Sequence, residues 1–147
     1  MRDNDNRHSD FERRGSNTNT CSLPEHPNDW RPGAFGYERL DAHRVAREAL
    51  VLGDRLVRRL PRGYSKLGDQ LRRALLSTYL GIAEGASRTG ADRLARFRCS
   101  RGEAAEAAAA LEAIEVLRLA PTADVRAIVA LLRRVAAMLT RLAKLSG

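Results

Sequence analysis

The chain has 147 residues and a formal net charge of +8, with 44% hydrophobic and only 5% aromatic residues. This length suits one domain with a real core and leaves no room for two. Apolar content dominated by alanine and leucine favours helices over a sheet. No apolar run approaches the ~20 residues that a membrane helix requires, and the polar N-terminus predicts neither a signal peptide nor an anchor.

Two cysteines, Cys21 and Cys99, lie far apart without CxxC spacing. We therefore expect reduced thiols and a cytoplasmic protein. Residues 1–36 are rich in Asn, Asp, Arg, Ser, Gly and Pro and show no hydrophobic period. Such a segment cannot bury enough apolar surface to offset its ordering entropy, so we expect a disordered tail there and a single domain over 37–147.

Four segments of the domain show helical periodicity. A first helix is expected over 37–60, with an apolar stripe, and it ends at Pro61. A second is expected over 65–86 and a third from about Thr89, where the sequence fits a variant of the capping box. A fourth follows Pro121 in heptad rhythm. Because the connections are short, these segments predict an all-α, antiparallel up-and-down four-helix bundle.

The expected second helix has a wider apolar face than one stripe requires. Besides its core positions it carries a second apolar set, namely Leu76, Tyr79, Leu80 and Ala83. Exposed apolar surface of that size is typical of an interface, and alanines in the third helix would let a neighbouring helix approach closely. We therefore expect a homo-oligomer. Gly81 is expected to permit a close helix approach.

No catalytic constellation stands out in this sequence. His43 is the only histidine on an expected helix, and a single surface histidine is more often solvated than catalytic. The third helix carries several glutamates, which lack the Glu-x-x-His pairs of a di-metal bundle and should pair with arginines instead. The sequence also lacks a P-loop, a dinucleotide turn and a nucleophile elbow. We therefore expect no enzyme activity, no cofactor and no metal site.

The positive charge lies in the expected bundle. Residues 1–36 hold five Arg against six acids, which leaves 21 of the 26 basic and 12 of the 18 acidic residues for the rest. Excess basic charge favours polyanions, and arginine suits phosphate because its planar fork donates two hydrogen bonds. The candidate nucleic-acid-binding residues are Arg44, Arg47, Arg55, Arg58, Arg62, Lys66, Arg72, Arg73, Arg133, Arg134 and Arg141.

Two other origins of this charge remain open. The arginines could form solvated helix faces with partners such as Glu48, Asp54 and Asp69. A GC-rich coding sequence could also produce the arginine bias without any nucleic-acid ligand. No aromatic platform or recognition-helix pattern accompanies the arginines, so base-specific contacts are not expected.

The junction of the second and third helices carries a recognisable motif. It includes Gln70-Leu71-Arg72-Arg73-Ala74, Ser77, Ile82-Ala83-Glu84-Gly85 and Arg88. This pattern resembles the signature of the 23S rRNA intervening sequence protein family, also labelled S23, a family of four-helix bundles. The resemblance extends from about Phe35 to the C-terminus. One position departs from it, because Gly81 stands where the family usually has Asn.

The resemblance implies a non-enzymatic, ring-forming bundle associated with nucleic acid. Some relatives are similar to the accessory variability protein of diversity-generating retroelements, a five-fold ring that associates with a reverse transcriptase. On this basis we expect a homopentamer that binds RNA or DNA as an accessory factor. The alternative is an oligomeric docking scaffold for a reverse transcriptase or a ribosome-associated partner, without direct nucleic-acid binding.

The family motif itself carries a structural expectation. Glu84 could form a simple ion pair with Arg88, four residues later, but an exposed pair contributes little stability. We therefore expect Glu84 to be partly buried. Its partners should be backbone N–H groups at the start of the third helix, or an arginine such as Arg72 or Arg73.

Overall fold

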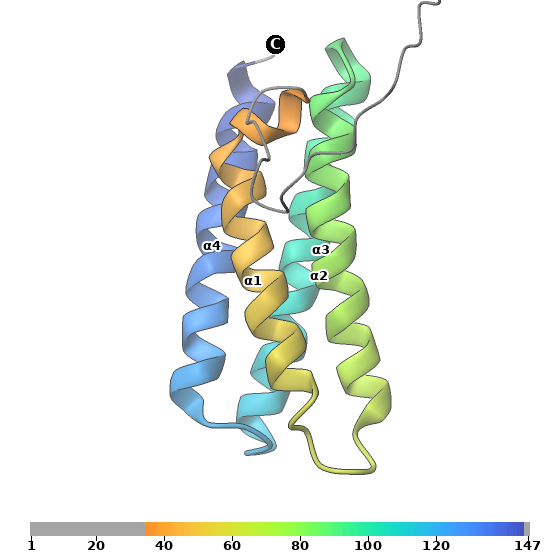
Figure 1. The fold of residues 1–147 in the computed structure, drawn as a ribbon. Coiled ribbons are helices and arrows are strands. Elements are labelled where there is room, and N and C mark those ends of the chain that lie inside the picture. Colours follow the sequence, from red (N-terminus) through yellow and green to blue (C-terminus); the bar gives the residue numbers. More distant parts are fainter. Residues whose placement is uncertain (1–34, 146–147) are drawn as a thin grey trace, which may run out of the picture. The chain divides into compact units, whose positions relative to one another are not determined.

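The computed structural model describes residues 35–145, so the expected disordered segment lies almost entirely outside the described part of the chain. A short 3-10 helix, η1 (Gly36–Arg39), precedes four α-helices (Figure 1). These are α1 (Asp41–Val57), α2 (Ser65–Ala86), α3 (Gly90–Val116) and α4 (Thr122–Leu145). No strand occurs within residues 35–145.

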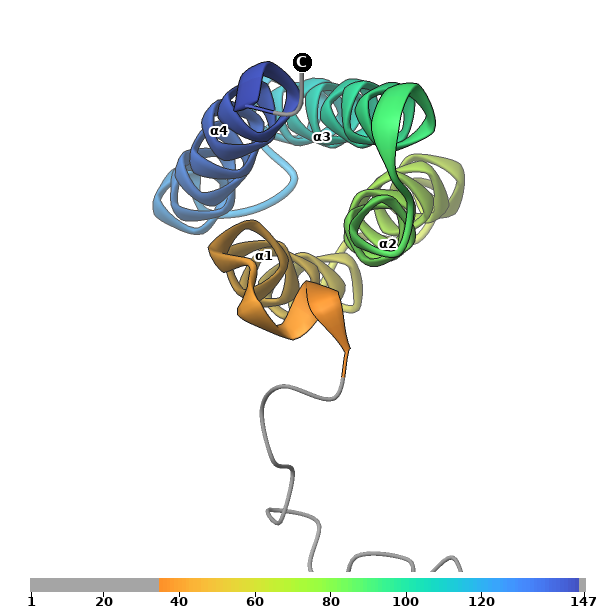
Figure 2. The same cartoon turned by 90° about the horizontal axis from the view of Figure 1, so that it is seen from above.

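The four helices form the expected antiparallel bundle. Each packs against two neighbours, since α1 contacts α2 and α4, and α3 contacts the same two helices. Seen from above, the helices occupy the corners of a square, with α1 diagonal to α3 (Figure 2). The connections cover only 58–64, 87–89 and 117–121, and such short links place consecutive helices side by side in opposite directions.

The core follows the helical periodicity of the sequence. Buried apolar side chains come from all four helices, and Phe97 of α3 is fully buried where it packs on Gly85 of α2. On α4 the heptad positions Val125, Ile128, Leu132 and Val135 are at most 2% exposed. Fully burying one such side chain contributes roughly 1.5–3 kcal/mol, so this stripe is what fixes α4 against the rest of the bundle.

The first helix is shorter than the sequence predicts. The expected range of 37–60 is wrong at both ends, because the chain turns through η1, extends at Leu40 (ψ 115°) and becomes α-helical only from Asp41. The side chain of Tyr37 stacks on the ring of Phe35 and packs on His43, with ring centroids 5.7 and 4.5 Å apart. At the other end, α1 gives way to a turn before Pro61, which disfavours helix in the residue that precedes it.

The second helix has the expected bounds but buries more of its wide apolar face than predicted. Tyr79 and Ala83 are half-buried within the chain's own bundle, and Tyr79 packs on His43 with ring centroids 4.3 Å apart. Only Leu76 and Leu80 of that second apolar set are exposed, at 47% and 52%. The apolar surface left for a partner is therefore narrower than the sequence suggests.

The third helix begins where the sequence predicts it, but without the expected capping box. Thr89 is extended and precedes Gly90, the first helical residue. The Thr89 side chain makes no capping hydrogen bond, so that part of the prediction is wrong.

Candidate nucleic-acid interface

The predicted basic residues of α1 lie on its outer side. Arg47, Arg55 and Arg62 are exposed, and Lys66 is exposed just beyond the turn that joins α1 to α2. Arg47 and Arg55 are eight residues apart, a little over two helical turns, so they share one face. None of the four forms an ion pair with another residue of the 35–145 segment.

The predicted basic residues of α4 divide between two sides of that helix. Ala127 lines a hollow of about 560 Å³ between α1 and α4, together with Arg55, Arg58 and Arg59. Arg134 and Arg141 follow Ala127 at intervals of seven residues, so they lie on the side of α4 that faces this hollow. Arg133 instead lines the hollow between α3 and α4, so the structure does not bring it together with the α1 arginines.

Four of the predicted arginines are paired with carboxylates. Arg58 and Arg72 both reach Asp54, with N···O distances of 2.7 and 3.0 Å. Arg73 lies 2.9 Å from Glu106, and Arg44 lies 3.2 Å from Asp41. For these four arginines the pairs support the alternative that they belong to solvated helix faces and are paired with acidic side chains.

Asp54 is the acceptor shared by two helices. The hydrogen bond from Arg58, followed by the one from Arg72, lowers the pKa of Asp54 below its ordinary value. Two guanidinium groups thus share the carboxylate of Asp54, and Arg72 also lies 3.9 Å from Asp69. The glutamates of α3 also pair with neighbouring helices, as expected: Glu106 with Arg73, and Glu115 with Arg126.

One basic residue of this surface escaped the sequence reasoning. Arg59 lines the hollow between α1 and α4 and lies 2.9 Å from Asp124 at the start of α4. Arg59 follows Arg55 by four residues, which is the spacing of neighbours on one face of a helix, so this spacing was the signal that could have included it. The turn after Val57 redirects Arg59 toward α4.

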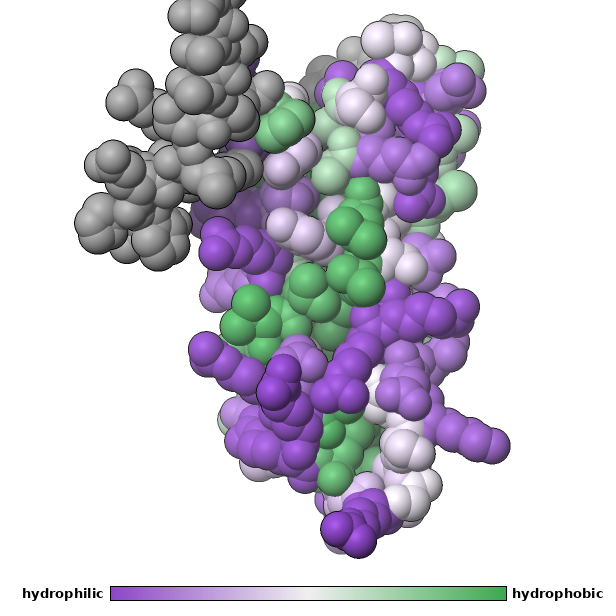
Figure 3. All heavy atoms as spheres, turned by 45° about the vertical axis from the view of Figure 1, so that its right-hand side comes forward, coloured by the Kyte–Doolittle hydropathy of each residue, from purple (hydrophilic) through white to green (hydrophobic). Residues whose placement is uncertain are grey.

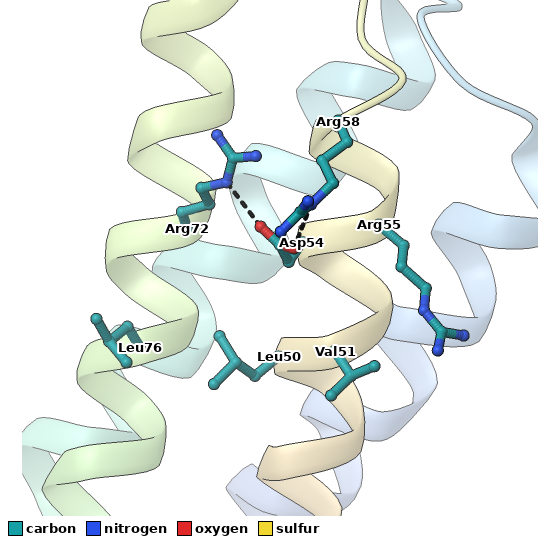
Figure 4. Close-up of a pocket in the computed structure, with 7 residues that line it drawn as sticks. All are labelled: Leu50, Val51, Asp54, Arg55, Arg58, Arg72 and Leu76. Atoms are coloured by element: carbon teal, nitrogen blue, oxygen red, sulfur yellow. Dashed lines mark hydrogen bonds and ion pairs between the residues drawn. The ribbon is translucent and has the colours of Figure 1, made fainter.

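A second hollow lies on the other side of the α1 arginines. Figure 4 shows this groove between α1 and α2, with Leu50, Val51 and Leu76 below the Asp54 cluster. It has a volume of about 690 Å³, and Arg55, Arg58 and Arg72 complete its lining. Aliphatic side chains and guanidinium groups therefore lie next to one another on an exposed surface.

The signature residues at the junction of α2 and α3 join these two helices. Ile82 is fully buried, and Gly85 is buried against the Phe97 ring, where an added Cβ would lie 2.7 Å from a ring carbon. Ala83 is half-buried. Arg88 follows the end of α2 and pairs with Glu84.

The prediction for Glu84 is wrong in its details. Its side chain, expected to be partly buried, is 43% exposed. Its partners are arginines, but they are Arg88, whose pairing had been judged too weak to explain the motif, and Arg96, instead of Arg72 or Arg73. The Nε atom of Arg96 lies 2.6 Å from the carboxylate and comes from the second turn of α3. Arg72 and Arg73 point elsewhere, to Asp54 and Glu106, because those acids lie at their own level of the bundle.

Gly81 marks a close approach between α2 and α3, as expected. A Cβ atom there would lie 2.3 Å from the hydroxyl of Ser100 and 2.9 Å from the guanidinium of Arg96. Ser100 is fully buried and donates a hydrogen bond to the Arg96 carbonyl oxygen. The space next to Gly81 is thus filled from α3 by Ser100 and Arg96.

Within residues 35–145 no group of His, Cys, Asp and Glu side chains is arranged to hold a metal ion. None of the helices in that range is both long enough and apolar enough to cross a membrane. His43 is buried between two tyrosines, and burial is the main cause that lowers its pKa. It therefore belongs to the packing of α1 rather than to an exposed acid–base site.

Comparison with known proteins gives one match. The model of the family described as 23S rRNA-intervening sequence protein matches residues 38–141, which span all four helices. No curated protein matches the chain.

Proposed function

Because this chain belongs to the 23S rRNA-intervening sequence protein family, we propose that it binds the phosphate backbone of RNA or DNA. In this role it acts as an accessory factor that catalyses no reaction. Phosphate contacts of this kind hold a nucleic acid in place without reading its bases.

The observation that carries the proposal is a set of exposed, unpaired cations on α1, on the turn that follows it and on α4. Arg47 and Arg55 are exposed on α1, and Arg55 lines the hollow between α1 and α4. Arg62 and Lys66 are exposed at the turn between α1 and α2, and Arg134 and Arg141 are exposed on the same side of α4 as Ala127, which lines that hollow. No carboxylate of the 35–145 segment pairs with any of them. An unpaired arginine offers its full set of donors to a phosphate, and its binding releases counterions that are condensed on the nucleic acid.

The test compares two variants that lose the same charge. In the first, Arg47, Arg62 and Lys66, which are unpaired within the described residues, are changed to Gln. In the second, Arg44, Arg73 and Arg126, which hold carboxylates, are changed to Gln. Binding of a fluorescein-labelled RNA, and of a DNA of the same sequence, is measured by anisotropy at several salt concentrations.

We expect the first variant to bind more weakly at every salt concentration. Its plot of log K against log salt should become less steep by about one unit for each lost phosphate contact. The second variant should stay close to the unmodified protein, because its arginines are already engaged. Equal losses in both variants would show that only total charge matters, and would contradict this interface.

The same titration distinguishes nucleic-acid binding from the alternative role, that of a protein-docking scaffold. A scaffold without nucleic-acid contacts would show no binding that falls steeply between low and physiological salt. A reverse transcriptase or ribosome-associated partner would then be sought in native lysate, with and without nuclease treatment.

Self-association is part of the proposed function. Its support is the exposed apolar surface on α3, where Val116 and Leu117 are 75% and 50% exposed and Ala105 and Ala109 lie on the outer side. Small residues allow a neighbouring helix to approach closely. The five-fold number comes from the family resemblance. A ring would repeat each weak phosphate contact and make the contacts cumulative.

A further inference from the structure

The groove between α1 and α2 forms part of a larger apolar surface. Leu50, Val51 and Leu76 line it, and Leu80 lies one turn further along α2 on the same face. Val51, Leu76 and Leu80 are 43%, 47% and 52% exposed. Figure 3 shows apolar residues gathered in a band on this side of the bundle, with hydrophilic residues next to it.

One end of this apolar surface carries positive charge. Arg55, Arg58 and Arg72 line the groove against a single carboxylate, that of Asp54. Asp54 already accepts hydrogen bonds from Arg58 and Arg72, while Arg55 pairs with no carboxylate within residues 35–145. Arg72 also lies 3.9 Å from Asp69, so Arg55 is the unpaired guanidinium of this lining. Figure 4 shows Arg58 and Arg72 turned to Asp54 above the aliphatic side chains, and Arg55 directed toward α4.

We propose that the groove between α1 and α2 binds an acidic amphipathic helix of a partner protein. The leucine or isoleucine side chains of that helix, spaced three and four residues apart, pack on Val51, Leu76 and Leu80. Its Asp or Glu side chains face Arg55, Arg58 and Arg72. A third helix laid along two antiparallel helices is a recurring mode of peptide recognition, with apolar anchors for burial and charge for orientation.

The chemistry of the lining favours a helix over a nucleic acid at this place. Single-stranded nucleic acids bury their bases on aromatic side chains or guanidinium planes. The groove lining contains no aromatic residue. Aliphatic side chains at i and i+4, such as Leu76 and Leu80, match the spacing of a partner helix instead. This site shares Arg55 with the unpaired cations on which the proposed nucleic-acid binding depends. The other cations of that set, Arg47, Arg62, Lys66, Arg134 and Arg141, do not line the groove.

The test uses the full chain and two labelled peptides of about 18 residues, long enough to form several helical turns. Both peptides carry the same leucines at helical spacing. One carries Glu and the other carries Lys on either side of the leucine stripe. Binding is measured by fluorescence anisotropy for the unmodified protein, for Leu76→Ser and for Tyr64→Ser, which removes another exposed large hydrophobic side chain, in the turn before α2.

We expect the unmodified protein and Tyr64→Ser to bind the acidic peptide equally well and to prefer it to the Lys peptide by at least about tenfold. Leu76→Ser should weaken binding of the acidic peptide by about tenfold or more while its circular dichroism and its nucleic-acid affinity stay unchanged. The variant of Arg47, Arg62 and Lys66 should lose RNA binding but keep its affinity for the acidic peptide. This result would show that peptide binding and the proposed nucleic-acid binding use different residues.

Three outcomes would overturn the inference. The first is equal affinity of the protein for the acidic and the Lys peptides, and the second is unchanged binding of the acidic peptide by Leu76→Ser. The third is a change in oligomeric state. If the unmodified protein is an oligomer and Leu76→Ser has the mass of one chain, a second copy of the chain covers the groove. A Leu76→Ser variant that unfolds is replaced by Val51→Ser, which alters the α1 side of the same surface.

Discussion

At the scale of single residues, Gly81 leaves less room for a side chain than any other glycine described on α2, because an added Cβ would lie 2.3 Å from the Ser100 hydroxyl. Gly53 on α1 is similarly close to its neighbour, Leu75, at 2.2 Å. A Cβ at Gly81 would overlap the Ser100 hydroxyl, which is buried and already bonded to a carbonyl oxygen. The Arg96 guanidinium above it is the end of a flexible side chain and can move aside. Ser100 therefore decides whether position 81 can hold any residue but glycine.

We predict that Gly81→Ala lowers the free energy of unfolding by about 1–3 kcal/mol, the usual range for overpacking a core. Ser100→Ala removes the overlapping hydroxyl, so Gly81→Ala should cost less in that background. The coupling free energy from the double-mutant cycle, measured by urea denaturation, should be at least about 0.5 kcal/mol. Additive effects would mean that α2 and α3 shift apart instead.

Gly102 supplies the matched control. It lies on an exposed part of α3, and an added Cβ there would meet nothing within 4 Å. Gly102→Ala should therefore raise the free energy of unfolding by roughly 0.5–1 kcal/mol, because alanine is the better helix former. The opposite signs at Gly81 and Gly102 separate steric overlap from helix propensity.

The pairing of arginines is the residue-scale feature that the sequence could not supply. Glu84 pairs with Arg96, twelve residues later, and Arg72 pairs with Asp54, eighteen residues earlier. Such pairs depend on the axial register of two helices, and helical periodicity gives the face of a residue but not its level. The sequence therefore predicted which basic residues are on the surface, but only the structure shows which of them are paired with carboxylates.

At the scale of elements, η1 is held to α1 through an aromatic cluster centred on His43. Its ring lies between Tyr37 of η1 and Tyr79 of α2, at 4.5 and 4.3 Å between centroids. Burial and then the charge of Arg47 lower the pKa of His43, and Glu38 opposes them. The folded protein thus favours the neutral imidazole.

We predict that the protein loses stability as the pH falls below about 6.5, the ordinary pKa of histidine. Below that value the unfolded chain binds a proton that folded His43 resists, so the free energy of unfolding decreases until the pH passes the lowered pKa. Melting temperatures measured from pH 7.5 to pH 5 should show a smaller decrease in His43→Gln. His8 and His26 remain in both proteins, so they cannot explain a difference. Parallel curves would contradict the role of His43.

The helices themselves were largely predictable, and their ends show why some details were not. The bounds of α2 and the buried heptad of α4 follow from apolar periodicity alone. The start of α1 was missed because Leu40 continues the apolar pattern while its backbone is extended. The turn there depends on the packing of Tyr37 on His43, a contact outside the reach of local propensity.

At the scale of the whole molecule, the central question is how many copies assemble. We predict a homo-oligomer, with five copies as the expected number, and light scattering at micromolar concentration measures its mass directly. Val116→Ser combined with Leu117→Ser should reduce that mass, since both side chains are exposed at the end of α3 and their burial would stabilise an interface. A mass of one chain for the unmodified protein would contradict self-association.

The close approach at Gly81 and Gly85 also has a kinetic consequence. It joins α2 and α3 next to their three-residue connection, 87–89, so these contacts close one of the smallest loops in the chain. Contacts between segments near in sequence cost little loop entropy and form early. We therefore expect the α2–α3 hairpin to form first in folding, before α1 and α4 pack onto it.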